Sequence, residues 1–179
     1  MIAVRSKKGQ VVFYDVVYVE VETKAKGRAV TVKLKDFGVY YRQDDLDALA
    51  EEMKDGASKV TVDKGQVVKV TKDKKGIIKR EVLAKAWTDW IDYWAVDFDF
   101  ENRTEIVRIT EAGGSERDVW TGGYIFENEW QSFRTRQDRD LELTTASHTY
   151  AKAGRYMIAV KVIDIFGNDT MTLVQVTAG

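Results

Sequence analysis

One short segment combines residue types that contact nucleic acids. Between Glu129 and Asp140 the sequence EWQSFRTRQDRD interleaves two aromatic residues with a glutamine and three arginines. Guanidinium groups bind phosphates in a two-pronged manner, and aromatic rings can stack on exposed bases. The expected DNA contacts are Trp130, Gln131, Arg134, Arg136 and Arg139. In the alternative interpretation Trp130 and Phe133 belong to the core, and the arginines pair with neighbouring acids such as Asp138.

A second set of cations lies in the N-terminal half of the chain. Lysines are dense between residues 69 and 80, where Lys72, Lys74 and Lys75 are expected to meet phosphates. Residues 1–80 carry 18 Lys and Arg against 12 Asp and Glu, whereas residues 81–179 carry 10 against 17. This asymmetry suggests an anionic partner that is bound with salt-sensitive, mainly sequence-independent affinity. A solvated, lysine-rich β-surface is the alternative explanation.

Three other groupings lack a part that their chemistry requires. Ser147 and His148 would need an orienting carboxylate and an oxyanion hole to form a hydrolase triad. Asp97, Asp99 and Asp164 could gather Ca²⁺, which takes several oxygen ligands, but the sequence offers no complete ligand set. The glycine pairs at 113–114 and 122–123 precede no helix, unlike a phosphate-binding loop. We therefore expect no catalytic residue, no metal site and no cofactor.

The composition predicts a globular protein. The chain has 179 residues, of which 44% are hydrophobic, and it includes five Trp, eight Tyr and seven Phe, enough to fill a core. No apolar run approaches the ~18 residues of a membrane span, and the N-terminus lacks the apolar region of a secretory signal. The absence of cysteine excludes disulfides, thiolate metal sites and cysteine nucleophiles. These features favour a cytoplasmic protein without a membrane partner.

The elements that must position the C-terminal candidates are β-strands. From residue 155 to 164, apolar and β-branched residues recur at every second position, a period typical of a strand with one buried face. The residues of that face are Tyr156, Ile158, Val160 and Val162. Turn residues flank this strand, and Met171 to Val176 supplies a closing strand. The pattern predicts a hairpin in the core of a β-sandwich, with the aromatic segment 87–100 as a core anchor.

The N-terminal half predicts a β-meander with one helix. Short alternating runs at 10–23, 29–34, 59–62, 66–71 and 77–83 are separated by turns. A helix is expected over 45–54, because apolar residues recur there at helical spacing after Asp44 and Asp45 and before Gly56. The predicted fold class is therefore mainly β, with a basic subdomain at 1–85 and an antiparallel sandwich at 86–179. The change in charge and the onset of aromatic residues place this boundary near Lys85.

The C-terminal hairpin also carries a family resemblance. The pattern HTY-x-x-x-G-x-Y-x-I-x-V-x-V-x-D-x-x-G runs from His148 to Gly167, and YWAVDFDF lies upstream at 93–100. Together they resemble the polycystic-kidney-disease (PKD) type of immunoglobulin-like domain over about residues 87–179. The resemblance implies an immunoglobulin-like sandwich in which His148 is a structural residue beside Tyr150. It also implies an alternative function, as a structural or adhesion module that binds protein or carbohydrate.

A wider set of segments carries a second resemblance over nearly the whole chain. The segments are GRAVTVKLKDF, SKVTVDKGQVVKVTKDKKGIIKREVL, WTDWIDYWAVDFDF, ENEWQSFRTR and IAVKVIDIFGNDT. They are similar to the C-terminal region of bacterial and archaeal site-specific, adenine-specific DNA methyltransferases of restriction–modification systems. The (D/N)-P-P-(Y/F/W) motif of these enzymes is missing, since the chain has no proline, and so is a Gly-rich cofactor loop. The resemblance thus implies a non-catalytic accessory domain that assists DNA binding, target recognition or docking to a catalytic domain or partner subunit.

Overall fold

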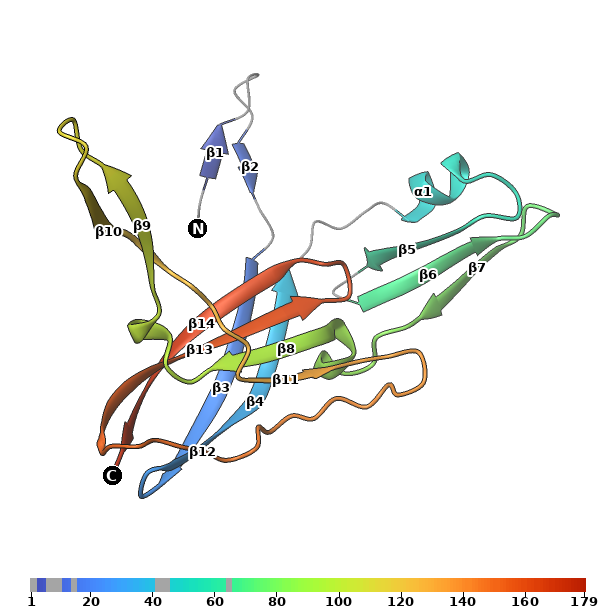
Figure 1. Cartoon of the computed structure of the whole chain (residues 1–179). Helices are drawn as coiled ribbons and strands as arrows, with labels where there is room; N and C mark the ends of the chain where they lie inside the picture. Colours follow the sequence, from blue (N-terminus) through green and yellow to red (C-terminus); the bar gives the residue numbers. More distant parts are fainter. Residues whose placement is uncertain (1–2, 6–10, 14–15, 41–45, 64–65) are drawn as a thin grey trace. The chain divides into compact units, whose positions relative to one another are not determined.

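The computed structural model describes residues 3–5, 11–13, 16–40, 46–63 and 66–179 (Figure 1). The chain divides into two compact units: unit 1 comprises residues 1–18 and 36–90, and unit 2 comprises residues 19–35 and 91–179. This division differs from the single boundary expected after residue 85, because residues 19–35 join the C-terminal half. The expected fold class is confirmed: the chain is mainly β, with antiparallel sheets and one short α-helix.

Unit 1 is built on a three-stranded antiparallel sheet in the order β5-β6-β7. Its strands are β5 (Ser58–Asp63), β6 (Gln66–Lys72) and β7 (Ile78–Val82). Helix α1 (Leu46–Glu52) buries Leu46 against Val68 and Val70 of β6, which confirms the predicted helix with a shorter C-terminal end. The predicted start at Asp44 and Asp45 lies outside the described residues. Unit 1 also holds the ribbon of β1 (Ala3–Arg5) and β2 (Val11–Phe13) and the 3-10 helix η1 (Trp87–Trp90).

The helices of the described residues are short. Helix α1 has seven residues, and the described chain contains no helix with the length and apolar character that crossing a membrane requires.

Unit 2 contains three antiparallel sheets, and the two larger ones are those expected for a β-sandwich (Figure 1). The four-stranded sheet has the order β11-β8-β13-β14, and the three-stranded sheet has the order β12-β4-β3. The first sheet consists of β11 (Trp130–Phe133), β8 (Ile91–Asp97), β13 (Gly154–Asp164) and β14 (Asp169–Ala178). The second consists of β12 (His148–Thr149), β4 (Ala29–Tyr40) and β3 (Val16–Lys26). The β3–β4 hairpin, which the sequence had placed in the N-terminal subdomain, therefore supplies most of the second sheet.

Alternation along the strands decides which side chains enter the core of unit 2. Of the four residues of β13 that were predicted to face inward, Ile158, Val160 and Val162 are fully buried, whereas Tyr156 is half-buried. Their cross-strand partners on β8 include Trp94, which lies beside Val162 and is also fully buried. Strand β4 contributes every second residue from the other sheet, namely Val30, Val32 and Leu34. Two apolar faces with a period of two thus remove each other from water.

An extended segment after β11 connects the two sheets. Leu34 on β4 donates its backbone N–H to the Leu143 carbonyl at 2.9 Å, and Thr145 donates to the Val32 carbonyl at 2.9 Å. The Val32 amide in turn donates to the Thr145 hydroxyl at 3.0 Å. From the four-stranded sheet, the Trp94 indole N–H donates to the Glu142 carbonyl at 2.7 Å. The segment therefore pairs with one sheet while a core tryptophan of the other sheet contacts it.

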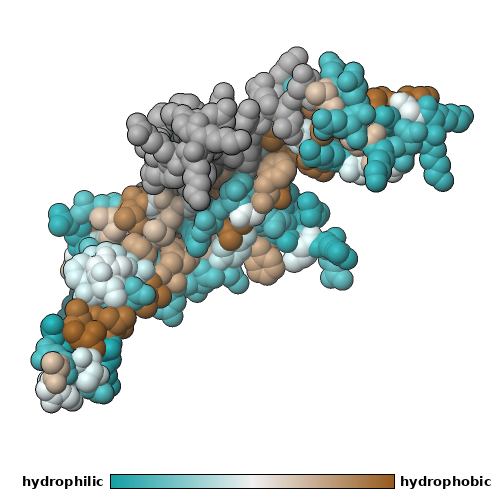
Figure 2. Space-filling model, turned by 90° about the horizontal axis from the view of Figure 1, so that it is seen from above, coloured by the Kyte–Doolittle hydropathy of each residue, from teal (hydrophilic) through white to brown (hydrophobic). Residues whose placement is uncertain are grey.

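A two-stranded hairpin forms a separate sheet of unit 2. Strand β9 (Thr104–Thr110) follows the short 3-10 helix η2 (Phe100–Asn102) and pairs with β10 (Glu116–Tyr124). The sequence pattern does not predict β10, because its charged residues and the glycines at 122–123 resemble turn chemistry. Gly122 has a φ of 88° where the register shifts between Trp120 and Tyr124. Figure 2 shows hydrophobic side chains exposed on this hairpin, at the lower left.

Because residues 19–35 belong to the sandwich, truncating a buried side chain in this segment should lower the free energy of unfolding. Leu34→Ala should lower the free energy of unfolding by about 2–5 kcal/mol, since it removes a fully buried side chain and leaves a cavity. Leu173→Ala is the matched control, because Leu173 is 50% exposed and its loss should change that free energy by less than about 0.5 kcal/mol. Chemical denaturation of both variants measures the difference. Equal effects would contradict the assignment of β4 to this core.

Candidate nucleic-acid interface

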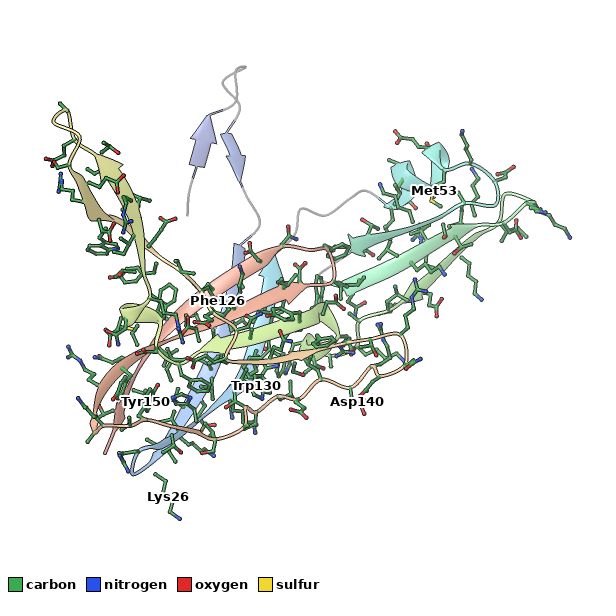
Figure 3. All side chains as sticks on the ribbon, viewed as in Figure 1. Lys26, Met53, Phe126, Trp130, Asp140 and Tyr150 are labelled. Carbon is green, nitrogen blue, oxygen red and sulfur yellow. The ribbon has the colours of Figure 1, made fainter. Side chains whose placement is uncertain are left out.

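The alternation of β11 separates the two aromatic residues of the predicted DNA-binding segment. Strand β11 pairs with β8 so that Trp130 lies opposite Val96 and Phe133 lies opposite Tyr93. Trp130 is half-buried, and its ring lies edge-on to the Trp94 ring with centroids 4.6 Å apart. Phe133, three residues later, is on the outer face and 50% exposed. Trp130, which is labelled in Figure 3, therefore packs against the core. Phe133 is accessible to a ligand.

Gln131 lies on the same outer face as Phe133 and is exposed. Its amide oxygen accepts hydrogen bonds from the Tyr93 hydroxyl at 3.4 Å and from the Asn128 amide at 3.3 Å. Burial raises the pKa of the Tyr93 phenol, so Tyr93 is the protonated donor in this pair. These contacts orient Gln131 and leave the hydrogens of its Nε2 group as its remaining hydrogen-bonding capacity.

The three arginines of the segment have different surroundings. Arg134 is half-buried, and its backbone N–H donates to the Asp92 carbonyl at 2.9 Å. A turn follows, in which the Thr135 hydroxyl accepts the Asp138 amide at 2.9 Å. Arg136 and Arg139 are exposed on this turn and the residues after it, and neither forms an ion pair with a described residue. The expectation that neighbouring acids neutralise all these arginines therefore fails for Arg136 and Arg139.

Lys72 has a structural role within unit 1. Its ammonium group donates to the carbonyls of Met53 at 3.0 Å and Ala50 at 3.3 Å, and it lies 3.8 Å from the Asp55 carboxylate. Carbonyls at a helix C-terminus lack intrahelical partners and carry partial negative charge. Lys72 satisfies those of α1, and its side chain is only 19% exposed. Among the three predicted lysines it is thus the least available to a phosphate.

The other two predicted lysines are exposed on the turn between β6 and β7. Asp73 shapes this turn, because its carboxylate accepts the amides of Lys75 at 2.7 Å and Ile77 at 2.9 Å. Lys74 and Lys75 form no ion pair with a described residue, and Lys79 on β7 is exposed and equally unpaired. Lys79 was not predicted individually, although its exposed position beside the turn could have been inferred from the strand pattern. These lysines belong to unit 1, whereas the arginines belong to unit 2.

A network around a buried carboxylate stands next to the outer face of unit 2. Asp97 is fully buried at the end of β8 and accepts hydrogen bonds from the amides of Asp99 and Glu127, each at 2.9 Å. Arg103 donates its Nε–H to the same carboxylate at 3.1 Å, and its terminal nitrogens pair with Glu127 and Glu129. Desolvation of Arg103 lowers its pKa, but the bond to Asp97 and the other carboxylates outweigh this and raise the pKa overall. This charged network ties the end of β8 to the hairpin base and to the residues before β11.

The aspartates considered for Ca²⁺ do not converge. Asp97 pairs with Ala159 in the β8–β13 register, while Asp164 lies opposite Ile91 at the other end of the same strands. Asp164 instead accepts the amides of Phe166 at 2.8 Å and Asn168 at 3.0 Å within its own turn. Within the described ranges no group of three acidic or histidine side chains could hold a metal ion.

His148 lies in an aromatic stack. Its ring is stacked on Phe98 with centroids 4.4 Å apart, and it meets the edge of Tyr150 at 4.6 Å. Tyr150 is buried and donates its hydroxyl to the Phe98 carbonyl at 2.8 Å, and burial raises the pKa of its phenol. The Glu129 carboxylate is 3.9 Å from the imidazole Nδ1. Because both flanking rings pack on the imidazole, the geometry gives His148 a role in packing at this end of unit 2.

Two hollows in unit 1 contain none of the arginines or aromatic residues of the segment. One, of about 310 Å³, is lined by the loop after β7, by Phe37 and by Trp87 and Trp90. The other, of about 360 Å³, lies between α1 and the β6–β7 strands. Three of its four charged side chains are already engaged, since Arg80 donates to Asp47 at 2.6 Å and Lys72 contacts the helix carbonyls.

The buried network predicts a stability effect that exposed pairs should not show. Asp97→Asn should lower the free energy of unfolding by about 1.5–3 kcal/mol, because it removes a charged acceptor from a buried site. Asp118→Asn is the control, since it weakens the exposed pair with Arg108 and should leave stability nearly unchanged. Thermal and denaturant unfolding of both variants provide the measurement. A larger loss for Asp118→Asn would contradict the role of the network.

No protein-family model, curated protein or solved structure matches the chain. The resemblances to PKD-type domains and to the C-terminal region of DNA methyltransferases therefore stay predictions. The function of this chain must be sought in the chemistry of the surfaces described above.

Proposed function

We propose that this chain is a non-catalytic accessory domain that binds DNA for a DNA-modifying enzyme in the cytoplasm. The enzyme class comes from the resemblance to adenine-specific methyltransferases of restriction–modification systems. The observation that carries the proposal is a set of exposed cations without acidic partners among the described residues. Those that lie in the two predicted DNA-binding segments are Lys74, Lys75 and Lys79 in unit 1 and Arg136 and Arg139 in unit 2.

Unpaired cations are the groups that a polyanion would use. A cation already paired with a carboxylate must give up that pair before it can bind a phosphate, whereas an unpaired, solvated cation gives up only counterions and water. Arg108 and Arg117 are examples of the first kind, because they pair with Asp118 at 2.8 Å and Glu111 at 2.7 Å. Arg136 and Arg139 are of the second kind. The proposed DNA contacts therefore exclude the β9–β10 hairpin.

The proposed contacts are mainly to the phosphate backbone. Lysine offers a point charge and arginine a planar, two-pronged donor, and both can bind phosphates of any sequence. Binding should then weaken steeply with salt. The slope of the logarithm of the association constant against the logarithm of the salt concentration should become more negative by about 0.9 for each phosphate contacted. Dissociation constants on the order of 1–100 µM near physiological salt would be in keeping with sequence-independent binding.

A second candidate function is protein docking, which the β9–β10 hairpin favours. Apolar side chains are exposed along it, including Ile106 at 50%, Val107 at 41% and Trp120 at 49%. The hairpin carries two arginines against four acids, so it is a poor surface for DNA. Exposed apolar patches of this kind commonly mark protein contacts. The hairpin would suit a catalytic domain of the same polypeptide, a partner subunit, or the protein ligand of a PKD-like adhesion module.

The DNA proposal predicts a difference between paired and unpaired arginines. The double variant Arg136→Ala, Arg139→Ala should weaken binding to a labelled duplex and reduce the magnitude of the salt slope by about 2. Arg108→Ala with Arg117→Ala removes the same charge but from residues held in ion pairs, and it should have little effect. Fluorescence anisotropy over a range of salt concentrations measures both quantities. Equal losses from the two double variants would mean that net charge alone, and not this surface, attracts DNA.

Charge reversal in unit 1 tests the other basic surface. Lys74→Glu with Lys75→Glu should weaken duplex binding more than Arg136→Ala with Arg139→Ala does, because it replaces attraction with repulsion. Glu51→Lys with Glu52→Lys is the control, because it reverses charge in the opposite direction at exposed positions of α1 and should not weaken duplex binding. If the wild-type chain shows no anisotropy change at tens of micromolar in low salt, DNA binding is excluded.

A further inference from the structure

The outer face of the four-stranded sheet has an aromatic end. On β11 and β8, Phe133 and Tyr93 are direct cross-strand neighbours, and Ile163 of β13 pairs with Tyr93 on its other side. Phe133 is 50% exposed, and Tyr93 and Ile163 are half-buried. The Cβ atoms of directly opposed residues on one sheet face lie about 5 Å apart, so Phe133 and Tyr93 are neighbouring aromatic side chains on this face. The outer face of a sheet is usually polar, so an exposed phenylalanine ring on this face suggests a binding surface.

A polar donor lies on this face, and two cations follow Phe133 closely in the chain. Gln131 lies on the same face, and its oxygen is engaged by Tyr93 and Asn128, which directs its hydrogen-bonding capacity to the Nε2 donors. Arg136 and Arg139 follow within six residues of Phe133 and are unpaired among the described residues. Lys161 is excluded from the set, because it binds Asp169 at 2.9 Å and lies over the Phe126 ring.

We propose that Phe133 and Tyr93, with Gln131, form a stacking platform for unpaired bases of single-stranded DNA, whose phosphates Arg136 and Arg139 bind. This inference rests on the proposed DNA-binding function and names the form of DNA that this surface prefers. An aromatic ring on a flat sheet can stack only on a base whose face is open. In a duplex both faces of each base are covered by neighbours, so the ring has no partner there.

The combination of groups argues for a nucleic acid on this face. A purely apolar partner would have no use for the two unpaired arginines that follow Phe133 in the chain. A polyanion without rings would have no use for an exposed phenylalanine. Single-stranded DNA has both a charged backbone and flat apolar bases, and proteins that bind it combine a basic groove with aromatic platforms. The Gln131 donors can bond base oxygen or nitrogen acceptors beside a stacked ring.

Phe133→Ala separates the two forms of DNA. In the full chain, the variant should weaken binding to a fluorescent 15-nucleotide oligothymidylate by about tenfold, which is typical of losing one stacked base. Binding to a duplex of the same length should change by less than about twofold, because phosphate contacts remain. Phe133→Trp should retain the affinity for the single strand, since its larger ring also stacks. Fluorescence anisotropy measures all three affinities.

Leu173→Ala is the matched control, because Leu173 is equally exposed, at 50%, on β14 of the same sheet but distant in strand order from β11. It should alter neither affinity. Since Phe133 is half-exposed, its replacement should preserve the melting temperature, which circular dichroism checks in the same samples.

The outcomes distinguish this inference from the proposed function. If Phe133→Ala affects both DNA forms equally, or neither, the stacking platform is overturned while DNA binding stands. If the wild-type chain binds neither oligonucleotide, the proposed function fails as well. If Phe133→Ala instead abolishes self-association in sedimentation velocity and leaves oligonucleotide binding intact, the surface is a protein contact and the inference is wrong.

Discussion

The Asp97 carboxylate places the strongest physical constraint on unit 2. A carboxylate removed from water must be compensated by donors and charge, and Asp97 is compensated by Arg103 and by the amides of Asp99 and Glu127. Those groups come from two separate stretches of chain, residues 99–103 and the segment before β11. The network therefore determines where the hairpin leaves the sandwich and how the chain approaches β11. Because Arg103 also holds Glu129, the residue just before β11, the register of β11 on β8 depends on the same network.

The register of β11 in turn decides the chemistry of the outer surface. Trp130 lies opposite Val96, so alternate residues of β11 face opposite sides of the sheet. Trp130 and Ser132 face the core, while Gln131 and Phe133 face outward. A shift by one residue would expose the tryptophan and bury the glutamine, at the cost of an unsatisfied polar group. The contact of Trp130 with Trp94 and the buried Ser132 hydroxyl, which accepts the Glu142 amide at 2.9 Å, both favour the observed register.

Residues of the same type have different availability because of their local partners. Lys72 and Lys74 are two residues apart, but the alternation of β6 directs Lys72 toward the C-terminus of α1, whereas Lys74 lies in an exposed turn. Arg108 lies opposite Asp118 on neighbouring strands and forms an ion pair, whereas Arg136 lies in the turn between Thr135 and Asp138 and forms none among the described residues. The number of lysines and arginines in a segment is therefore larger than the number that can bind a polyanion.

Local patterns were sufficient to predict the mainly β fold class, the β13–β14 hairpin and α1. Period-two and helical spacing are properties of neighbouring residues, so Ile158, Val160 and Val162 could be assigned to the core in advance. Strand β10 could not be predicted, because its pairing with β9 compensates for residues that favour turns. The sequence by itself determined which residues could bind an anion or a base. Only the tertiary structure decided that Val30, Val32 and Leu34 close the sandwich and that Phe133, not Trp130, is exposed, since strand pairing between distant segments sets which face of each strand is buried.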